Sequence, residues 1–227
     1  KTYDKLKKLD YIWKKQRKKS MDDKRKMKEL ISDISHQTRT PAANMKLYLE
    51  ILKQEDLTQE ERTYYLEKLE MQEEKLEFFM ESLVKMSRLE SEVLTLHMDD
   101  RAVSATLGKA VAAIVPKAQK KQISIYVDCE ESIRLYHDAK WTEEAIFNLL
   151  DNAVKYTEPK GKIRISVKEQ EIYTKISVCD TGKGIEQSRQ AEIFQRFYRE
   201  PEVYQEEGIG IGLYLARKII TMQNGYM

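Results

Sequence analysis

The chain has 227 residues, of which 34% are charged and 41% hydrophobic, with 8 Gly, 4 Pro and a formal net charge of +2. This length predicts one large domain or two small ones, and the composition is typical of a soluble, helix-rich protein with a modest core. The near balance of charge gives the whole chain no electrostatic attraction to nucleic acid, so we exclude nucleic acid as a partner.

Basic residues cluster in residues 1–28. We interpret this cluster as a solvated helix; the alternative is a segment just inside a membrane, where Lys and Arg favour the cytoplasmic side. No run approaches the roughly 20 apolar residues of a membrane span, and no signal peptide is visible. Since the chain begins with Lys1 rather than Met, we expect a fragment of a longer protein, attached to a membrane only through segments absent from this chain.

The two cysteines, Cys129 and Cys179, are far apart and lack metal-ligand spacing. We expect both to be reduced and buried, as in a cytoplasmic protein.

Residues 1–95 carry helix signals, with Pro41 as their only proline and no glycine. Thr58 followed by Glu61 predicts a capping box that opens a second helix after a short polar turn. Residues of the second helix that alternate in steps of three and four form a heptad seam with two polar members: Leu66, Leu69, Glu73, Leu76, Met80, Leu83 and Ser87. An antiparallel hairpin with one apolar stripe per helix buries little alone, so we expect a homodimer with a four-helix bundle.

The second half of the chain changes to period two. Three segments alternate apolar and polar residues and are predicted strands: "QISIYVD", "KIRISVKE" and "IYTKISVCD". A helix between the first two begins after Asp138, its predicted N-cap, and "GIGIGL" leads into a last amphipathic helix. These elements predict an α+β two-layer sandwich. We expect a helical domain over residues 1–95 and a second domain over residues 96–227, with the boundary between 92 and 102.

Polar residues of the segment "NLLDNAVKYT" border its buried side. Asn148, Asn152 and Lys155 follow one another by four and three residues, and therefore share a helical face. Carboxamide oxygens there are suitable ligands for Mg²⁺, a hard cation that takes oxygen ligands and keeps several waters. The alternative is a helix with ordinary polar surface residues.

Two glycine-containing segments follow this helix in the sequence. In "DTGKGI", Asp180 can accept a hydrogen bond from an exocyclic amine, and Gly182 and Gly184 let the backbone approach a flat base; alone, such a segment is more often only a turn. In "GIGIGL", the glycines precede a helix, whose free N–H groups favour phosphate. The spacing excludes a P-loop. In "IFQRFYRE", Phe194 and Phe197 are candidate anchors; Arg196 and Arg199 are candidate phosphate partners.

In chain order, these segments resemble four boxes of sensor histidine kinases, within the Bergerat-type ATPase superfamily. "NLLDNAVKYT" resembles the N box, "DTGKGI" the first glycine box, "IFQRFYRE" the F box and "GIGIGL" the second glycine box. "ISHQTRTP" resembles the phosphoacceptor box of the same kinases, in its expected place on a helical hairpin. The resemblance covers the chain from about Asp22 onward.

The resemblance implies ATP and Mg²⁺ as cofactors, with His36 receiving the γ-phosphoryl group and passing it to an aspartate of a response regulator. It implies that Asn152 coordinates Mg²⁺ and that Asp180 selects adenine. It also implies a mobile lid over residues 186–207 and a place in the cytoplasmic part of a membrane sensor. The implied nucleotide-binding residues are Asn148, Asn152, Lys155, Tyr156, Asp180, Gly182, Gly184, Ile185, Arg196, Arg199, Gly208, Gly210, Gly212 and Leu213.

Three positions near the acceptor histidine have separate expectations. Pro41 cannot donate a helix hydrogen bond to the carbonyl of Gln37, so we expect a bend that exposes His36. Thr40 matches the position that in such kinases orients a water for dephosphorylating the regulator. Gln37 departs from the family, which usually has Glu or Asp there, and the family's next strand is missing after residue 227.

Two alternatives to an active histidine kinase stay open. One is a pseudokinase scaffold, and the other is a Bergerat-type ATPase of another class.

Overall fold

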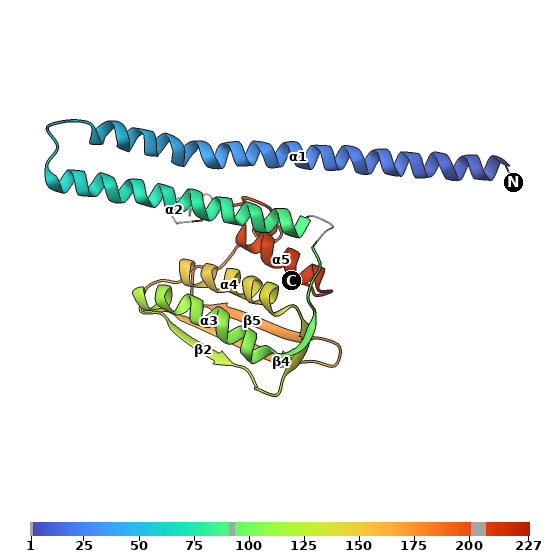
Figure 1. Cartoon of the computed structure of the whole chain (residues 1–227). Coiled ribbons are helices and arrows are strands. Elements are labelled where there is room, and N and C mark those ends of the chain that lie inside the picture. The colour runs from blue at the N-terminus through green and yellow to red at the C-terminus, as the bar shows by residue number, and fades with distance from the viewer. Residues whose placement is uncertain (1, 91–93, 201–207) are drawn as a thin grey trace. The chain divides into compact units, whose positions relative to one another are not determined.

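The computed structural model describes residues 2–90, 94–200 and 208–227. The chain forms two compact units, Lys1–Phe78 and Phe79–Met227 (Figure 1). The unit boundary falls inside a helix, so the last turns of that helix belong to the second unit. The assignment of domains to residues 1–95 and 96–227 stays a prediction.

The first unit is a helical hairpin. Helix α1 covers Thr2–Leu52, and α2 covers Gln59–Glu90. The predicted capping box at the start of α2 is confirmed: the Glu61 carboxylate accepts the Thr58 N–H at 2.9 Å, and the Thr58 hydroxyl accepts the Glu61 N–H at 3.2 Å. The two helices meet through Tyr48 and Tyr65, whose ring centroids are 6.1 Å apart.

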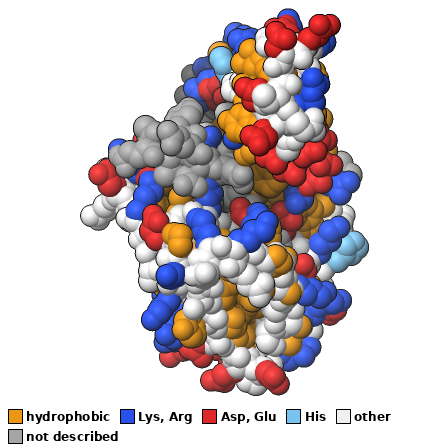
Figure 2. Space-filling model, turned by 90° about the vertical axis from the view of Figure 1, so that its left-hand side faces the viewer, with side chains coloured by type: hydrophobic (Ala, Val, Ile, Leu, Met, Phe, Trp, Pro, Cys, Tyr) orange, Lys and Arg blue, Asp and Glu red, His pale blue; other side chains and the backbone are white. Residues whose placement is uncertain are grey.

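Apolar side chains remain exposed on both helices. Figure 2, viewed from the side of the α1–α2 turn, shows hydrophobic side chains among acidic ones on the hairpin. In the first unit the exposed large hydrophobic residues include Met27, Ile31, Leu47, Leu49, Tyr64, Leu66, Met71 and Phe78. Leu66 of the predicted seam is 47% exposed. One hairpin therefore leaves its apolar seam partly uncovered.

The second unit has a mixed sheet with helices on one face (Figure 1). Its strands are β2 (Ser124–Asp128), β4 (Lys162–Glu169) and β5 (Thr174–Asp180); β2 is parallel and β5 antiparallel to β4. The helices are α3 (Val103–Lys120), α4 (Ala139–Tyr156) and α5 (Gly212–Met222). A separate antiparallel pair joins β1 (Asp99–Ala102) to β3 (Arg134–His137). Two short 3₁₀ helices, η1 (Gln187–Arg189) and η2 (Glu192–Phe194), follow β5.

The core of this unit lies between the sheet and the helices. Strand β4 shows the predicted alternation most clearly, because Ile163, Ile165 and Val167 are buried while Lys162 and Arg164 are exposed. The buried members from the helices and the segments beside them are Val103, Leu107, Ala110, Ile114, Ala118, Ile146, Leu150, Ala153 and Val154. The predicted helical hairpin followed by an α+β layer sandwich is confirmed.

Three elements were not predicted, and one expectation was wrong. Helix α3 and strands β1 and β3 were not predicted from the sequence. Cys129 is half-buried and Cys179 is exposed, although both were expected to be buried. Cys179 pairs across the sheet with the exposed Arg164, so the pleat of β5 turns its thiol away from the helices. Among the described residues, no helix is long and apolar enough to cross a membrane.

Candidate active site

Helix α4 carries the predicted N box, and its start is fixed by a side-chain cap. The Asp138 carboxylate accepts the Trp141 N–H at 3.1 Å, as predicted, and also the backbone N–H of His97 at 2.8 Å. The buried stripe of α4 packs on the core, which leaves Asn148 and Asn152 half-buried on its flank. Both carboxamides therefore stand where a ligand can reach them.

Both glycine boxes lie against α4. A Cβ atom on Gly212, the first residue of α5, would stand 2.8 Å from Oδ1 of Asn148. A Cβ atom on Gly208 would stand 2.9 Å from Nζ of Lys155. One on Gly182 would stand 2.5 Å from the carbonyl oxygen of Tyr156, at the end of α4. The two glycine boxes, which are far apart in sequence, thus lie within contact distance of one helix.

The second glycine box also contacts the F box. Gly210 has φ +76°, a left-handed conformation that L side chains rarely adopt, and its α-carbon lies against the backbone of Phe197 and Tyr198. The buried Ile209 and Ile211 alternate with these glycines and anchor the loop. Leu213, in the first turn of α5, is half-buried. The F box therefore joins the site through the second glycine box, which in turn lies against α4.

Lys155 and Tyr156 act on each other at this end of α4. The Lys155 ammonium donates to the Tyr156 hydroxyl at 3.1 Å and lies 4.7 Å from the centroid of its ring. The ammonium is thereby held beside the glycine of the second box, where the predicted phosphate groups belong.

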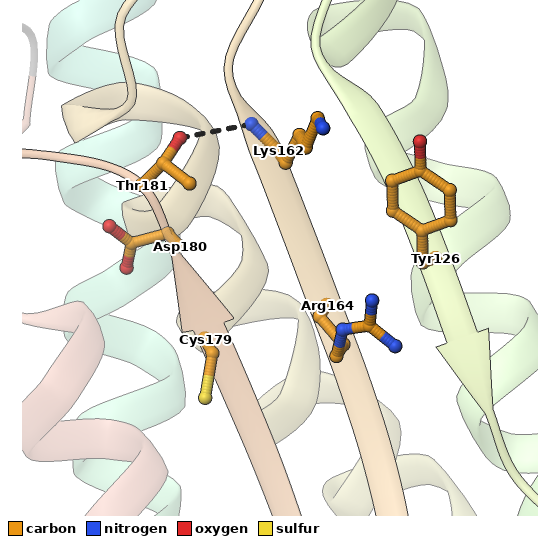
Figure 3. A pocket seen from close by; sticks show the side chains of 6 residues that line it. All are labelled: Tyr126, Lys162, Arg164, Cys179, Asp180 and Thr181. Atoms are coloured by element: carbon orange, nitrogen blue, oxygen red, sulfur yellow. Dashed lines mark hydrogen bonds between the residues drawn. The ribbon is translucent and has the colours of Figure 1, made fainter.

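Asp180 ends β5 on the helix side of the sheet. Its cross-strand partner is the buried Ile163, and its Oδ1 accepts the Gly182 N–H at 2.8 Å. In the close-up of Figure 3 the Asp180 side chain points away from Tyr126 and Arg164, and all three residues line a hollow of about 440 Å³ together with Lys162, Cys179 and Thr181. Gly184 (φ +73°) and Ile185 follow Asp180 on exposed backbone.

The F box contacts the end of α2 rather than open solvent. Arg196 lies 3.0 Å from the Glu90 carboxylate and stacks over the Tyr214 ring at 5.0 Å. The Tyr214 hydroxyl donates to Glu90 at 2.7 Å. Burial and then this bond raise the pKa of Tyr214 to about 12, because both disfavour the phenolate. Arg196, a predicted phosphate partner, thus has a carboxylate partner here, and Arg199 is half-buried nearby in sequence.

His36 lies on α1 in the first unit and is exposed, as is Thr40, while Gln37 is half-buried. The hydroxyls of Ser35 and Thr38 donate to the carbonyls of Ile31 and Ile34, both at 2.8 Å. Helix α1 continues without interruption through Pro41. The bend expected at this proline stays a prediction.

The carboxamide oxygens beside the glycine boxes are consistent with a Mg²⁺ ion that is bound jointly by the protein and by nucleotide phosphates. Among the described residues, no group of three or more His, Cys, Asp or Glu side chains could hold a metal ion by itself. Mg²⁺ is usually bound by one or two protein oxygens together with substrate phosphates. Half-buried carboxamides beside a glycine loop match that pattern. The residues involved in this prediction are Asn148 and Asn152.

Two polar residues beside this site, Glu144 and Lys85, were not predicted. Glu144 of α4 bonds to Asn148 and to Lys85 of α2. Glu144 precedes Asn148 by four residues on the same helix, so the helical spacing was the signal that could have identified it.

Two family models match this chain. Residues 26–92 match the His Kinase A (phospho-acceptor) domain, and residues 137–227 match the histidine kinase-, DNA gyrase B- and HSP90-like ATPase domain. The chain belongs to the sensor histidine kinases. The match between 26 and 92 includes His36, and the match between 137 and 227 includes all four nucleotide boxes of this kinase core.

Curated relatives of this kinase core include sensor proteins of bacteria. It is 29% identical over 193 residues to the swarming motility regulation sensor protein RssA of Serratia marcescens, covering 85% of this chain and 41% of that protein. It is 26% identical to the sensor protein kinase PmrB of Pseudomonas aeruginosa, covering 87% of this chain and 41% of that protein. The kinase core thus spans about two fifths of these relatives.

Solved structures share its fold. The histidine kinase AdeS of Acinetobacter baumannii matches with a TM-score of 0.66 at 24% identity, covering 82% of this chain and 86% of that one. ThkA in complex with the response regulator protein TrrA matches with a TM-score of 0.65 at 19% identity, covering 87% and 55%. Full-length ShkA in complex with AMPPNP matches with a TM-score of 0.60 at 23% identity, covering 86% and 41%. Part of the predicted lid, residues 201–207, lies outside the described residues.

Proposed function

We propose that this chain is the cytoplasmic kinase core of a membrane-bound sensor, which phosphorylates itself on His36 with ATP and passes the phosphoryl group to an aspartate of a response regulator. The observation that carries the proposal is the meeting of both glycine boxes with Asn148, Lys155 and Tyr156 along α4. A neighbour by fold that was solved with AMPPNP adds support for ATP as the nucleotide.

In this proposal each box has a separate task. Oδ2 of Asp180 accepts a hydrogen bond from the amino group of adenine, since Oδ1 already accepts the Gly182 N–H. The start of α5 binds phosphate through its free N–H groups, and Lys155 contributes positive charge. Asn152 and Asn148 hold Mg²⁺, which, when bound, offsets negative charge on the transferring phosphoryl group.

The acceptor chemistry takes place at the imidazole. A nitrogen of His36 attacks the γ-phosphorus in line, the bond from that phosphorus to the β–γ bridging oxygen breaks, and ADP leaves. The imidazole proton passes to water. The amide oxygen of Gln37 can accept from the second imidazole N–H and orient the ring, but it cannot act as a base.

The phosphoryl group then passes to the aspartate of a response regulator, and ThkA, a neighbour by fold, was solved with such a partner. We also infer a phosphatase role, in which Thr40 holds a water and Gln37 positions it. A homodimer is part of the proposal, because Leu66 and Met80 of the predicted seam remain exposed on a single hairpin.

Incubation with γ-³²P-labelled ATP and Mg²⁺ tests the proposal. We expect a label that is stable to base and lost in acid, as a phosphoramidate requires, and no label in His36→Ala. Gln37→Glu should preserve or raise the rate, because a carboxylate orients the ring and also stabilises the imidazolium. General-base assistance, which Gln37 cannot give and a carboxylate can, typically raises a rate by ~10²–10⁴-fold.

Gln37 also favours a second candidate, a nucleotide-binding pseudokinase that acts as a dimeric scaffold. Absence of label on the native chain, with label in Gln37→Glu, would support the scaffold. ATP hydrolysis without any label on histidine would instead indicate an ATPase of another class.

A further inference from the structure

Glu144 stands between helix α2 and the nucleotide-binding side of α4. Its carboxylate accepts two hydrogen bonds from the Lys85 ammonium, at 2.8 and 3.0 Å. The same carboxylate accepts a hydrogen bond from Nδ2 of Asn148 at 3.3 Å. The Glu144 side chain is 24% exposed and that of Lys85 39%, so the pair is partly withdrawn from solvent. All three residues belong to the second compact unit.

These bonds determine which way the Asn148 carboxamide points. Nδ2 donates to the backbone carbonyl of Glu144 at 2.8 Å as well as to its carboxylate, so both amide hydrogens have acceptors. The two ends of a carboxamide have nearly the same shape, and only the hydrogen-bond partners distinguish them. Oδ1 therefore turns the other way, to the first residue of α5, where a Cβ on Gly212 would stand 2.8 Å from it.

We propose that Glu144 is a positioning residue that keeps the amide oxygen of Asn148 directed at the bound Mg-nucleotide, and that Lys85 holds Glu144 in place. The inference rests on the proposed function, because it presumes that Asn148 serves a cation. A cation requires an oxygen, and a reversed amide would present N–H groups to it. Glu144 acts only through Asn148.

The arrangement also links α2 to the nucleotide. Lys85 lies on α2, and its ion pair with Glu144 is one step from the carboxamide. If the Lys85 contact favours the productive amide, binding of Mg-nucleotide must favour the Lys85 contact by the same factor. Lys85 and Glu144 should therefore behave as one unit in a double-mutant cycle.

Titration calorimetry on the full chain tests the inference, with ATP added in the presence of Mg²⁺ and, separately, of a chelator. Loss of a partner that orients a metal ligand typically costs about 10- to 100-fold in metal affinity, and we expect Glu144→Ala to weaken Mg-ATP binding about tenfold. ATP without Mg²⁺ should bind almost as before. Glu144→Gln should bind Mg-ATP like the native chain, since its amide oxygen still accepts from Asn148.

Lys85→Ala should weaken Mg-ATP binding by a smaller factor and add nothing to Glu144→Ala. Lys117→Ala is the matched control, because Lys117 forms a 2.6 Å ion pair with Asp151 elsewhere on α4. Native Mg-ATP affinity in Glu144→Ala would overturn the inference, and so would a Glu144→Gln variant as weak as Glu144→Ala. If Glu144→Ala does not fold, the Glu144→Gln and Lys85→Ala results decide.

Asn148→Ala separates this inference from the proposed function. Weaker Mg-ATP binding in Asn148→Ala, with native affinity in Glu144→Ala, would overturn only the role of Glu144. A native chain that does not bind Mg-ATP would overturn both.

Discussion

Replacing Asp180 with Asn should reverse the hydrogen-bonding character of the position that we assign to the adenine amino group. Oδ1 of Asp180 accepts the Gly182 N–H at 2.8 Å, so that position requires an acceptor. Asparagine can satisfy Gly182 only by placing its amide oxygen there. Its NH₂ group then occupies the place of Oδ2, and two donors face each other when ATP binds.

The size of the effect follows from this loss. A hydrogen bond to a charged group contributes about 1.5–3 kcal/mol net, and about 1.4 kcal/mol corresponds to tenfold in Kd. We therefore expect Asp180→Asn to weaken ATP binding about 10- to 150-fold.

Titration calorimetry with Mg-ATP and Mg-inosine triphosphate measures both parts of the reasoning. Inosine carries a carbonyl oxygen where adenine has its amino group, so the Asp180→Asn variant should gain affinity for it relative to ATP. Asp128→Asn, the same change at an exposed residue that ends β2, is the control. Unchanged ATP affinity in Asp180→Asn would refute our placement of the base, and an equal loss for both nucleotides would point to structural damage.

Three other predictions concern stability and assembly. Gly108 lies in an exposed part of α3, where an added Cβ meets nothing within 4 Å, so Gly108→Ala should stabilise the second unit by about 0.5–1 kcal/mol. Gly210→Ala should destabilise this unit, because φ at Gly210 is +76°. Thermal melts measure both changes. Burial and Glu90 raise the pKa of Tyr214 to about 12. The stability that the neutral Tyr214 hydroxyl contributes is therefore fully present below pH 10 and is lost as pH rises through 12. Tyr214→Phe should remove one phenolate step near pH 12 in an absorbance titration. Light scattering at micromolar concentration should give a dimeric mass, and a monomer would contradict the four-helix bundle.

Elements with strong local signals were predictable from the sequence. The Thr58–Glu61 capping box and the Asp138 N-cap each depend on residues within one helical turn, and the alternation of β4 depends on residues within one strand. Such signals survive folding because they are satisfied locally.

Elements whose stability comes from distant partners were not predictable. Helix α3 contains Gly108 and Pro116, both unfavourable inside a helix, and burial of residues such as Leu107 and Ile114 outweighs them. Strand β1, with the sequence "DDRA", shows no alternation at all and exists because it pairs with β3. In both cases tertiary packing overrides local propensity.

The candidate site divides in the same way. Motif residues such as Asn148 and Asp180 were identified from residue types and spacing. Their partners were not, because Lys85 precedes Glu144 by 59 residues and Glu90 precedes Tyr214 by 124. No sequence period connects positions so far apart, so only the fold brings them together.

The local backbone around His36 suits an acceptor that must meet a nucleotide carried by another unit. Pro41 removes the donor that the Gln37 carbonyl would use in a regular helix. The Ser35 and Thr38 hydroxyls bond to carbonyls one turn back, a contact that slightly destabilises and bends helices. Three weakened turns in succession lower the cost of local distortion there, while the capping box of α2 and the Tyr48–Tyr65 contact lie toward the turn of the hairpin. We therefore expect the helix to deform more easily around His36, the proposed phosphoacceptor, than at the turn of the hairpin.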